Sequence, residues 1–228
     1  MGHDEVQALK LSLKVAVWAV AIGLPLALAV ATLLARCEFP GKVIVDALLH
    51  MPLVVPPVVT GYLLLFWLGR NGTIGAWLAD HFGIVFAFRW TGAVIAAAVM
   101  SFPLMVRPIR LAIEAIDPRL EEAARTLGAS PLSIYATITV PLAAPGLIVA
   151  AILGFAKSLG EFGATITFVG NIPDETRTLA NAIYTFMQTV DGDAAAMRLV
   201  LVAIGLSFAA LVAVELLARK ARVRTHGL

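Results

Sequence analysis

The sequence has little charge and almost no cysteine. Only 14% of its 228 residues are charged, whereas 60% are hydrophobic. Soluble domains carry about 25% charged and about 45–50% apolar residues, so the composition excludes a soluble globular protein and predicts an integral membrane protein. The formal net charge of +2 is too small to indicate nucleic-acid binding. A single cysteine, Cys37, excludes an intrachain disulfide and a multi-cysteine metal site.

Motifs for nucleotide binding and catalysis are absent from the sequence. Gly41-Lys42 is followed by Val43, so there is no G-x-x-x-x-G-K-[ST] loop to hold a phosphate. No H-E-x-x-H occurs, and Ser158 lies outside any G-x-S-x-G setting. We therefore expect a chain that is not itself an enzyme, without cofactor or metal, which takes its energy from a partner. Residues 1–10 carry acids where a signal peptide carries bases, so no cleavage is expected.

Long apolar runs dominate the sequence and predict an all-α membrane protein. A bilayer-spanning helix needs about 20 apolar residues, and five runs meet this length, at residues 11–35, 48–68, 87–106, 143–169 and 199–218. The second run contains MPLVVPPVVTG, whose prolines predict a broken helix that lines a cavity or packs against protein. Shorter apolar segments at 74–88 and 179–190 are predicted to lie at the outer interface.

A polar, helix-forming segment separates the third run from the fourth. Asp117 and Pro118 suit the N-cap and first position of a helix, and Gly128 suits its end. Ser130-Pro131 repeats the start signal, so a second short helix is expected. Val140-Pro141 is predicted to stop that helix, because the residue before proline is steered out of helical geometry.

This segment carries a family motif. Glu122, Ala123, Ala124, Gly128, Ile138 and Pro141 match E-A-A-x3-G-x9-I-x-L-P, with Val140 in place of leucine. With this motif the segment resembles the cytoplasmic coupling loop of bacterial ABC importer permeases. The alternative is a solvated amphipathic loop helix without a binding role. The resemblance implies that residues 117–141 fit a cleft on an ATPase subunit. It assigns the coupling role to Asp117, Glu121, Glu122, Ala123, Ala124, Arg125, Gly128 and Pro141.

Basic residues agree with this placement of the loop. With the loop inside, the inner segments hold ten basic residues: Arg36, Lys42, Arg107, Arg110, Arg119, Arg125, Arg219, Lys220, Arg222 and Arg224. The outer segments hold six: Lys10, Lys14, Arg70, Arg89, Arg177 and Arg198. This excess fits the positive-inside rule. Five spans then place the N-terminus outside and the C-terminus inside.

Two ionisable residues lie within the fourth run. Lys157 and Glu161 stand four residues apart, which on a helix is the spacing of a neutralising pair. An intramembrane ionisable residue also marks a functional site by default. A structural ion pair and a gating role therefore both stay open. The nearby glycines 154, 160 and 163 leave bare backbone, either for close helix packing at a dimer axis or for exposed N–H donors.

Longer strings starting at Leu48, Ala96 and Ala156 resemble the molybdate transporter permeases, over about residues 9–218. Sulfate and thiosulfate permeases share the G-E-[FY]-G element but are usually longer. The resemblance implies one type I ABC importer transmembrane domain in the bacterial cytoplasmic membrane. It also implies a homodimer among membrane lipids, two copies of an ATPase subunit, and a periplasmic or surface oxyanion-binding protein.

The expected function is alternating-access transport of an oxyanion. Candidates for the pathway and gate are Pro56, Pro57, Thr60, Gly61, Ser101, Ser158, Gly160, Glu161, Gly163 and Thr165. Each hydroxyl among them is also a common helix-packing group. Tungstate and sulfate stay open as substrates beside molybdate. A secondary transporter with Lys157 and Glu161 as a proton relay is the rival mechanism, and a membrane-embedded enzyme lacks a recognisable catalytic group.

Overall fold

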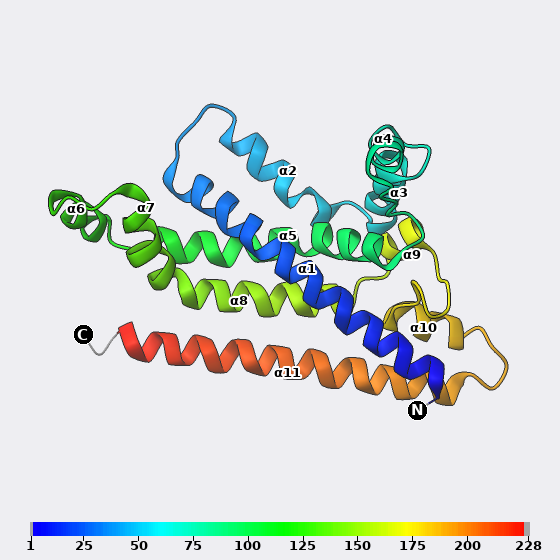
Figure 1. Cartoon of the computed structure of the whole chain (residues 1–228). Coiled ribbons are helices and arrows are strands. Elements are labelled where there is room, and N and C mark those ends of the chain that lie inside the picture. Colours follow the sequence, from blue (N-terminus) through cyan, green and yellow to red (C-terminus); the bar gives the residue numbers. More distant parts are fainter. Residues whose placement is uncertain (1, 226–228) are drawn as a thin grey trace.

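The computed structural model describes residues 2–225, with side chains to residue 216, and in this range every regular element is a helix (Figure 1). The long helices are α1 (His3–Arg36), α5 (Trp90–Glu114), α8 (Val140–Leu159) and α11 (Asp193–Thr225). The shorter ones are α2 (Lys42–Val54), α3 (Pro57–Leu68), α4 (Thr73–Phe82), α6 (Pro118–Thr126), α7 (Pro131–Ile134), α9 (Gly163–Val169) and α10 (Leu179–Phe186). A π-helical turn, η1 (Tyr135–Thr139), joins α7 to α8.

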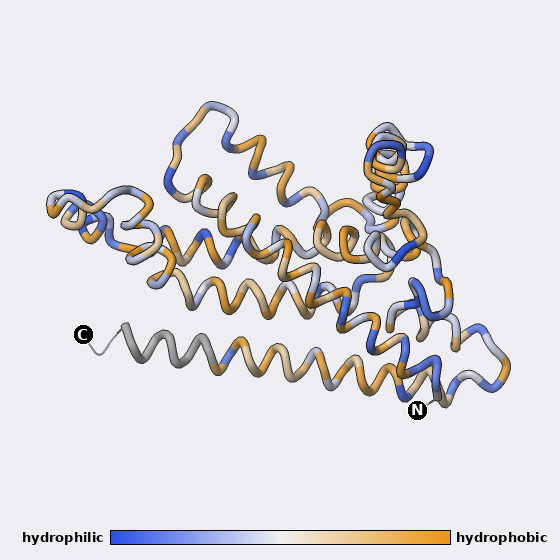
Figure 2. Tube along the Cα trace, in the orientation of Figure 1, coloured by the Kyte–Doolittle hydropathy of each residue, from blue (hydrophilic) through white to orange (hydrophobic). Residues whose placement is uncertain are grey.

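The described helices include four that are long and apolar enough to cross a membrane, at His3–Arg36, Trp90–Glu114, Pro131–Leu159 and Asp193–Leu216. A fifth crossing is available if α2 and α3, which meet at an angle of 111°, form one broken span. The predicted all-α membrane fold is confirmed, and so is the break in the proline-rich second run. Figure 2 shows hydrophilic residues gathered towards the two ends of the long helices and hydrophobic residues along their middles.

The core forms where α1, α5 and α8 pack along one another. Ala19, Gly23, Ala27 and Ala31 recur every four residues on the buried face of α1, which lets neighbouring helices approach closely. Met105 of α5 fills the space between them. A Cβ at Gly23 would lie 2.5 Å from Met105 Cε, and one at Gly154 of α8 would lie 2.7 Å from its Sδ. The bare backbone at Gly154 therefore serves packing within the chain.

Two helices run on past the points predicted from the sequence. The helix that contains the third predicted span does not stop near Val106 but continues to Glu114, where the Arg110 guanidinium bonds the Glu114 carboxylate one turn along. Val140-Pro141 does not stop the following helix either. The Val140 N–H reaches back five residues to the Tyr135 carbonyl, and this wider π-turn accommodates Pro141, which has no N–H to donate.

The fourth apolar run, by contrast, is not one helix. It breaks at residues 160–162 between α8 and α9. The predicted helix at 179–190 ends at Phe186. The basic tail at 219–224 falls within α11, but its side chains lie outside the part of the chain that the structure describes.

Candidate functional site

The two helix breaks meet in space. α3 packs against α9, and glycines on both helices make the contact possible (Figure 1). A Cβ at Gly61 would lie 2.6 Å from the Ala164 carbonyl oxygen, and a Cβ at Gly163 would lie 2.7 Å from Pro57 Cβ. The fold thus brings together three of the predicted pathway residues, Pro57, Gly61 and Gly163, which are up to about a hundred residues apart in sequence.

Glu161 lies in the second break, where each of its two carboxylate oxygens accepts a hydrogen bond. Lys157 Nζ donates to Glu161 Oε2 at 2.7 Å, and the Ala164 backbone N–H donates to Glu161 Oε1 at 3.0 Å. The Glu161 side chain is 1% exposed, and that of Lys157 is 29% exposed. The predicted ion pair is therefore present. Glu161 also caps the first turn of α9, where the helix dipole favours a negative charge. The sequence signal for this second role was an acid two residues before Gly163.

The predicted pathway hydroxyls are mostly engaged in helix packing. Ser101 donates to the Ala97 carbonyl at 2.7 Å, and Ser158 Oγ donates to Ser101 Oγ at 3.4 Å. Thr165 donates to the Phe162 carbonyl at 2.9 Å. Thr60 differs, since its hydroxyl makes no hydrogen bond among the described residues and its oxygen stays accessible, with 9% of the residue exposed. The exposed pathway candidates on the single chain are Pro56, Pro57 and Gly160.

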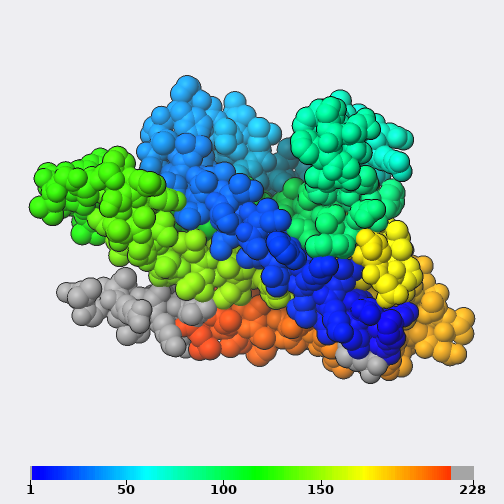
Figure 3. Space-filling view, in the orientation of Figure 1, coloured from blue at the N-terminus to red at the C-terminus, as the bar shows by residue number. Residues whose placement is uncertain are grey.

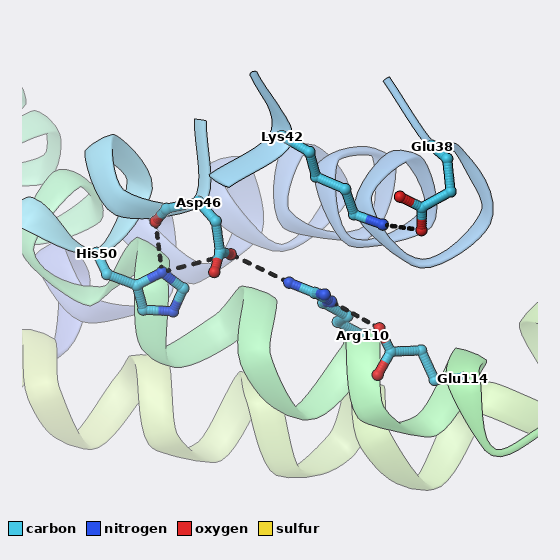
Figure 4. A network of polar contacts seen from close by, with 6 residues as sticks. All are labelled: Glu38, Lys42, Asp46, His50, Arg110 and Glu114. Carbon is cyan, nitrogen blue, oxygen red and sulfur yellow. Dashed lines mark hydrogen bonds and ion pairs between the residues drawn. The ribbon is translucent and has the colours of Figure 1, made fainter. Parts of the chain in front are cut away.

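A charged network, shown in Figure 4, fixes α2 to α5. Arg110 Nη1 lies 3.1 Å from Asp46 Oδ1, while Arg110 Nε donates to Glu114 at 2.7 Å. His50 Nδ1 lies 2.8 Å from the Asp46 carbonyl oxygen. No residue of α2 is buried, so this ion pair and the packing of half-buried Leu49 on the core link the helix to the rest of the chain. Sequence analysis missed Asp46 and His50, because nothing in their local pattern shows that Arg110 comes alongside.

The segment at 117–141, called here the coupling segment, forms the two short helices expected of it. The Arg119 N–H donates to Asp117 Oδ1 at 3.0 Å, and the Ser133 N–H donates to Ser130 Oγ at 3.3 Å. Both predicted caps are confirmed. Gly128 has a φ of +84°, the left-handed conformation that favours glycine at a helix end.

The coupling segment presents apolar side chains to its surroundings. No residue of α6 is buried, and Leu127 is 88% exposed beside exposed Leu120 and Leu132. Exposed leucines on a polar segment favour the prediction that this segment docks onto a partner. The side chains of Glu122 and Arg125 are exposed and make no polar contact with other described residues. Glu121 differs, because its carboxylate turns back to Arg36 and Thr139 of its own chain.

The remaining residues of the coupling motif are exposed or half-buried. Ala123 and Pro141 are exposed, and Ala124 is half-buried. The family described as the binding-protein-dependent transport system inner membrane component matches residues 20–223. The chain belongs to this family.

Curated relatives cover nearly the whole of this inner membrane component. The molybdenum transport system permease protein ModB of Escherichia coli K12 is 59% identical over 98% of each chain. ModB of Haemophilus influenzae is 53% identical over 95% of this chain and 94% of its own. The sulfate transport system permease protein CysT of E. coli K12 is 38% identical over 74% of this chain but 60% of its own.

Solved structures share the fold of this inner membrane component. A bacterial ABC transporter that imports alginate gives a TM-score of 0.71 at 18% identity, covering 97% of this chain and 80% of that one. The MetNI methionine ABC transporter gives 0.65 at 18% identity, covering 95% and 99%. These neighbours show the type I ABC importer permease fold. Together with the apolar helices, family membership makes the chain a multi-pass permease component of the inner membrane.

Proposed function

We propose that the chain is the permease subunit of an ATP-driven importer that carries molybdate across the cytoplasmic membrane by alternating access. The main observation that supports this proposal is the 59% identity to E. coli ModB over 98% of both chains. The second ModB relative, at 53% identity, supports the same substrate. In this proposal the chain binds no nucleotide itself, and the assembled complex hydrolyses ATP.

The orientation follows from which segments share an end of the molecule. The coupling segment lies at the same end as the turn between α1 and α2 and the C-terminal end of α11 (Figure 1). The N-terminus, α4 and α10 lie at the other end. The positive-inside excess counted from the sequence favours the first end as cytoplasmic. We therefore place the N-terminus outside and the C-terminus inside.

The proposed assembly has two copies of this chain, two ATPase subunits and one oxyanion-binding protein, with lipid around the transmembrane domain at residues 9–218. One solved neighbour is an alginate ABC transporter in complex with a substrate-bound periplasmic protein, which supports the binding-protein partner. The exposed leucines of the coupling segment support an ATPase docking surface there, with Glu122 and Arg125 available for charges of the partner.

The pathway is proposed to run past the two helix breaks. Proline and glycine residues at 56, 57, 61, 160 and 163 lie at the breaks before α3 and α9 and in the first turns of these helices. Irregular backbone at membrane depth is tolerated where it lines a cavity or packs against protein. Beside these breaks Lys157 pairs with Glu161, so its positive charge is neutralised within the chain. A pathway with few free positive charges binds a dianion weakly and so releases it readily.

Sulfate is the alternative substrate with specific support, since CysT is 38% identical over 74% of this chain. The alignment covers only 60% of CysT, in keeping with the longer chains of sulfate permeases, and this favours molybdate. Tungstate resembles molybdate in charge and shape. The choice between the two falls to the binding protein.

Uptake of labelled molybdate by proteoliposomes tests the proposal. Vesicles holding this chain, its ATPase and its binding protein should accumulate molybdate only with ATP, and excess sulfate should compete poorly. Vesicles holding this chain alone with an imposed proton gradient should accumulate none. Uptake by the chain alone would establish the secondary-transporter alternative instead, and effective competition by sulfate would overturn the substrate assignment.

A further inference from the structure

The C-terminal end of α1 holds both halves of the coupling segment. Thr32 and Arg36 lie four residues apart and so share one face of α1. The Arg36 Nη2 donates to Glu121 Oε1 of α6 at 2.7 Å. The Thr32 hydroxyl lies 3.1 Å from the hydroxyl of Tyr135, the first residue of η1. One helix face therefore contacts α6 and the π-turn at once.

Glu121 is the centre of this contact. The oxygen that accepts from Arg36 also accepts from the Thr139 hydroxyl at 2.9 Å. The Glu121 side chain is 13% exposed, whereas the neighbouring Glu122 faces outward. Hydrogen bonds between charged partners are roughly twice as strong as neutral ones. Because no residue of α6 is buried, the Glu121 carboxylate is the strongest side-chain link that this helix makes to α1.

The opposite end of α1 is fixed as firmly. The Leu179 N–H of α10 donates to Ser12 Oγ at 2.6 Å, and buried Glu5 forms an ion pair with Arg198 of α11. With 34 residues at 1.5 Å per residue, α1 is about 50 Å long. It crosses the molecule from the coupling segment to α10 in Figures 1 and 3, where it is the dark blue element. Its small-residue face packs on α5 and α8 between these ends.

The path along the backbone from the coupling segment to α8 contains more flexible elements than the contact with α1. A displacement of α6 that is transmitted along the backbone passes through Gly128, α7 and the π-turn before it reaches α8. A π-turn is a rare interruption of a regular helix and often lies at a functional site. Such a turn can absorb part of a displacement. The contact through Glu121 bypasses it.

We propose that Glu121 is a positioning residue that clamps the coupling segment to α1, and that α1 carries the movement of that segment to α10 and α11 at the far end. This inference rests on the proposed function, since it needs an ATPase to move the coupling segment. It assigns Glu121 to transmission within the chain, and it leaves contact with the ATPase to the outward-facing residues of α6.

The test measures molybdate uptake and ATP hydrolysis together in proteoliposomes of the complete complex. Glu121→Gln keeps the size of the side chain but removes its charge. It should retain ATP hydrolysis and lower uptake per ATP by about 2- to 30-fold, the range for residues within a coupling network. Thr139→Val, which removes only the second bond, should act in the same direction but more weakly. An Arg36→Met/Glu121→Gln double variant should be no worse than the more severe single one.

Glu38→Gln is the matched control. Glu38 is a carboxylate at the same end of the molecule, and its partner Lys42 lies four residues along the same stretch of chain. Its loss should leave uptake per ATP unchanged. Unchanged uptake per ATP in Glu121→Gln would overturn the clamp. Loss of the ATPase on co-purification would overturn it too, because Glu121 would then be a docking residue.

A distance measurement tests the clamp without transport. Cys37 is the single cysteine and is exposed next to Arg36, so it accepts a spin label, and Arg119→Cys on exposed α6 accepts a second. In the complex, Glu121→Gln should broaden the distance distribution between the labels. An unchanged distribution would refute the clamp. If the wild-type complex takes up no molybdate, the proposed function fails while this measurement still decides the contact.

Discussion

Gly163 of α9 faces Pro57 of α3 so closely that a Cβ on the glycine would lie 2.7 Å from the proline Cβ. Each of these residues stands at the first position of a half-helix that follows a break. Two interruptions that look independent in the sequence are therefore one structural feature. The proposed pathway depends on it.

Enlarging this contact should damage both stability and transport. In Gly61→Ala the new methyl would meet the Ala164 carbonyl oxygen at 2.6 Å, and backbone cannot move aside as a flexible side chain can. Overpacking of this kind costs about 1–3 kcal/mol, so the melting temperature in detergent should fall. Gly205→Ala in α11 is the control. A Cβ there meets nothing within 4 Å, so stability should hold or rise.

Replacing Lys157 alone should destabilise the chain more than replacing both Lys157 and Glu161. Lys157→Met leaves the Glu161 carboxylate buried with only the Ala164 N–H, and breaking a buried ion pair from one side costs about 3–5 kcal/mol. Glu161→Gln in the same background should recover part of that loss. Thermal unfolding of the three variants checks the order. A single Lys157→Met as stable as the wild type would contradict a stabilising role for this ion pair.

Changes on the outward face of the coupling segment should uncouple transport from ATP hydrolysis. Gly128→Pro cannot reach the required φ of +84°, since proline holds φ near −65°. Glu122→Lys reverses a charge that has no partner among the side chains that the structure describes. We expect normal membrane insertion with uptake lost in both, measured by fractionation and by molybdate uptake. Normal transport in both would count heavily against the coupling role of residues 117–141.

Breaking the network in Figure 4 should loosen α2 without unfolding the core. Arg110→Met removes the partner of Asp46 at 3.1 Å. The Arg110 and Asp46 side chains are 27% and 39% exposed, and an ion pair exposed to this extent contributes about 0.2–1 kcal/mol. α2 adds only half-buried residues such as Leu49 to this contact. Amide hydrogen exchange across Lys42–Val54 should therefore quicken, while exchange in α1 stays slow. Equal protection of α2 in Arg110→Met and wild type would contradict this account.

The sequence alone determined what depends on neighbouring residues. Apolar runs of sufficient length required membrane helices, MPLVVPPVVTG required a break, and Asp117 and Ser130 determined where α6 and α7 begin. These are properties of local hydrophobicity, proline geometry and side-chain caps. The E-A-A motif likewise identified the family before any contact was known, since its spacing is read along one continuous segment.

Tertiary structure decided what depends on residues distant in the chain. Only packing shows that Glu121 turns back to Arg36, eighty-five positions away, while Glu122 next to it faces outward. The same holds for the two helix breaks that meet at Gly163 and Pro57. The physical reason is that the direction of a helix face is fixed by its neighbours. Burial and charge pairing across helices therefore cannot be read from a local pattern of residues.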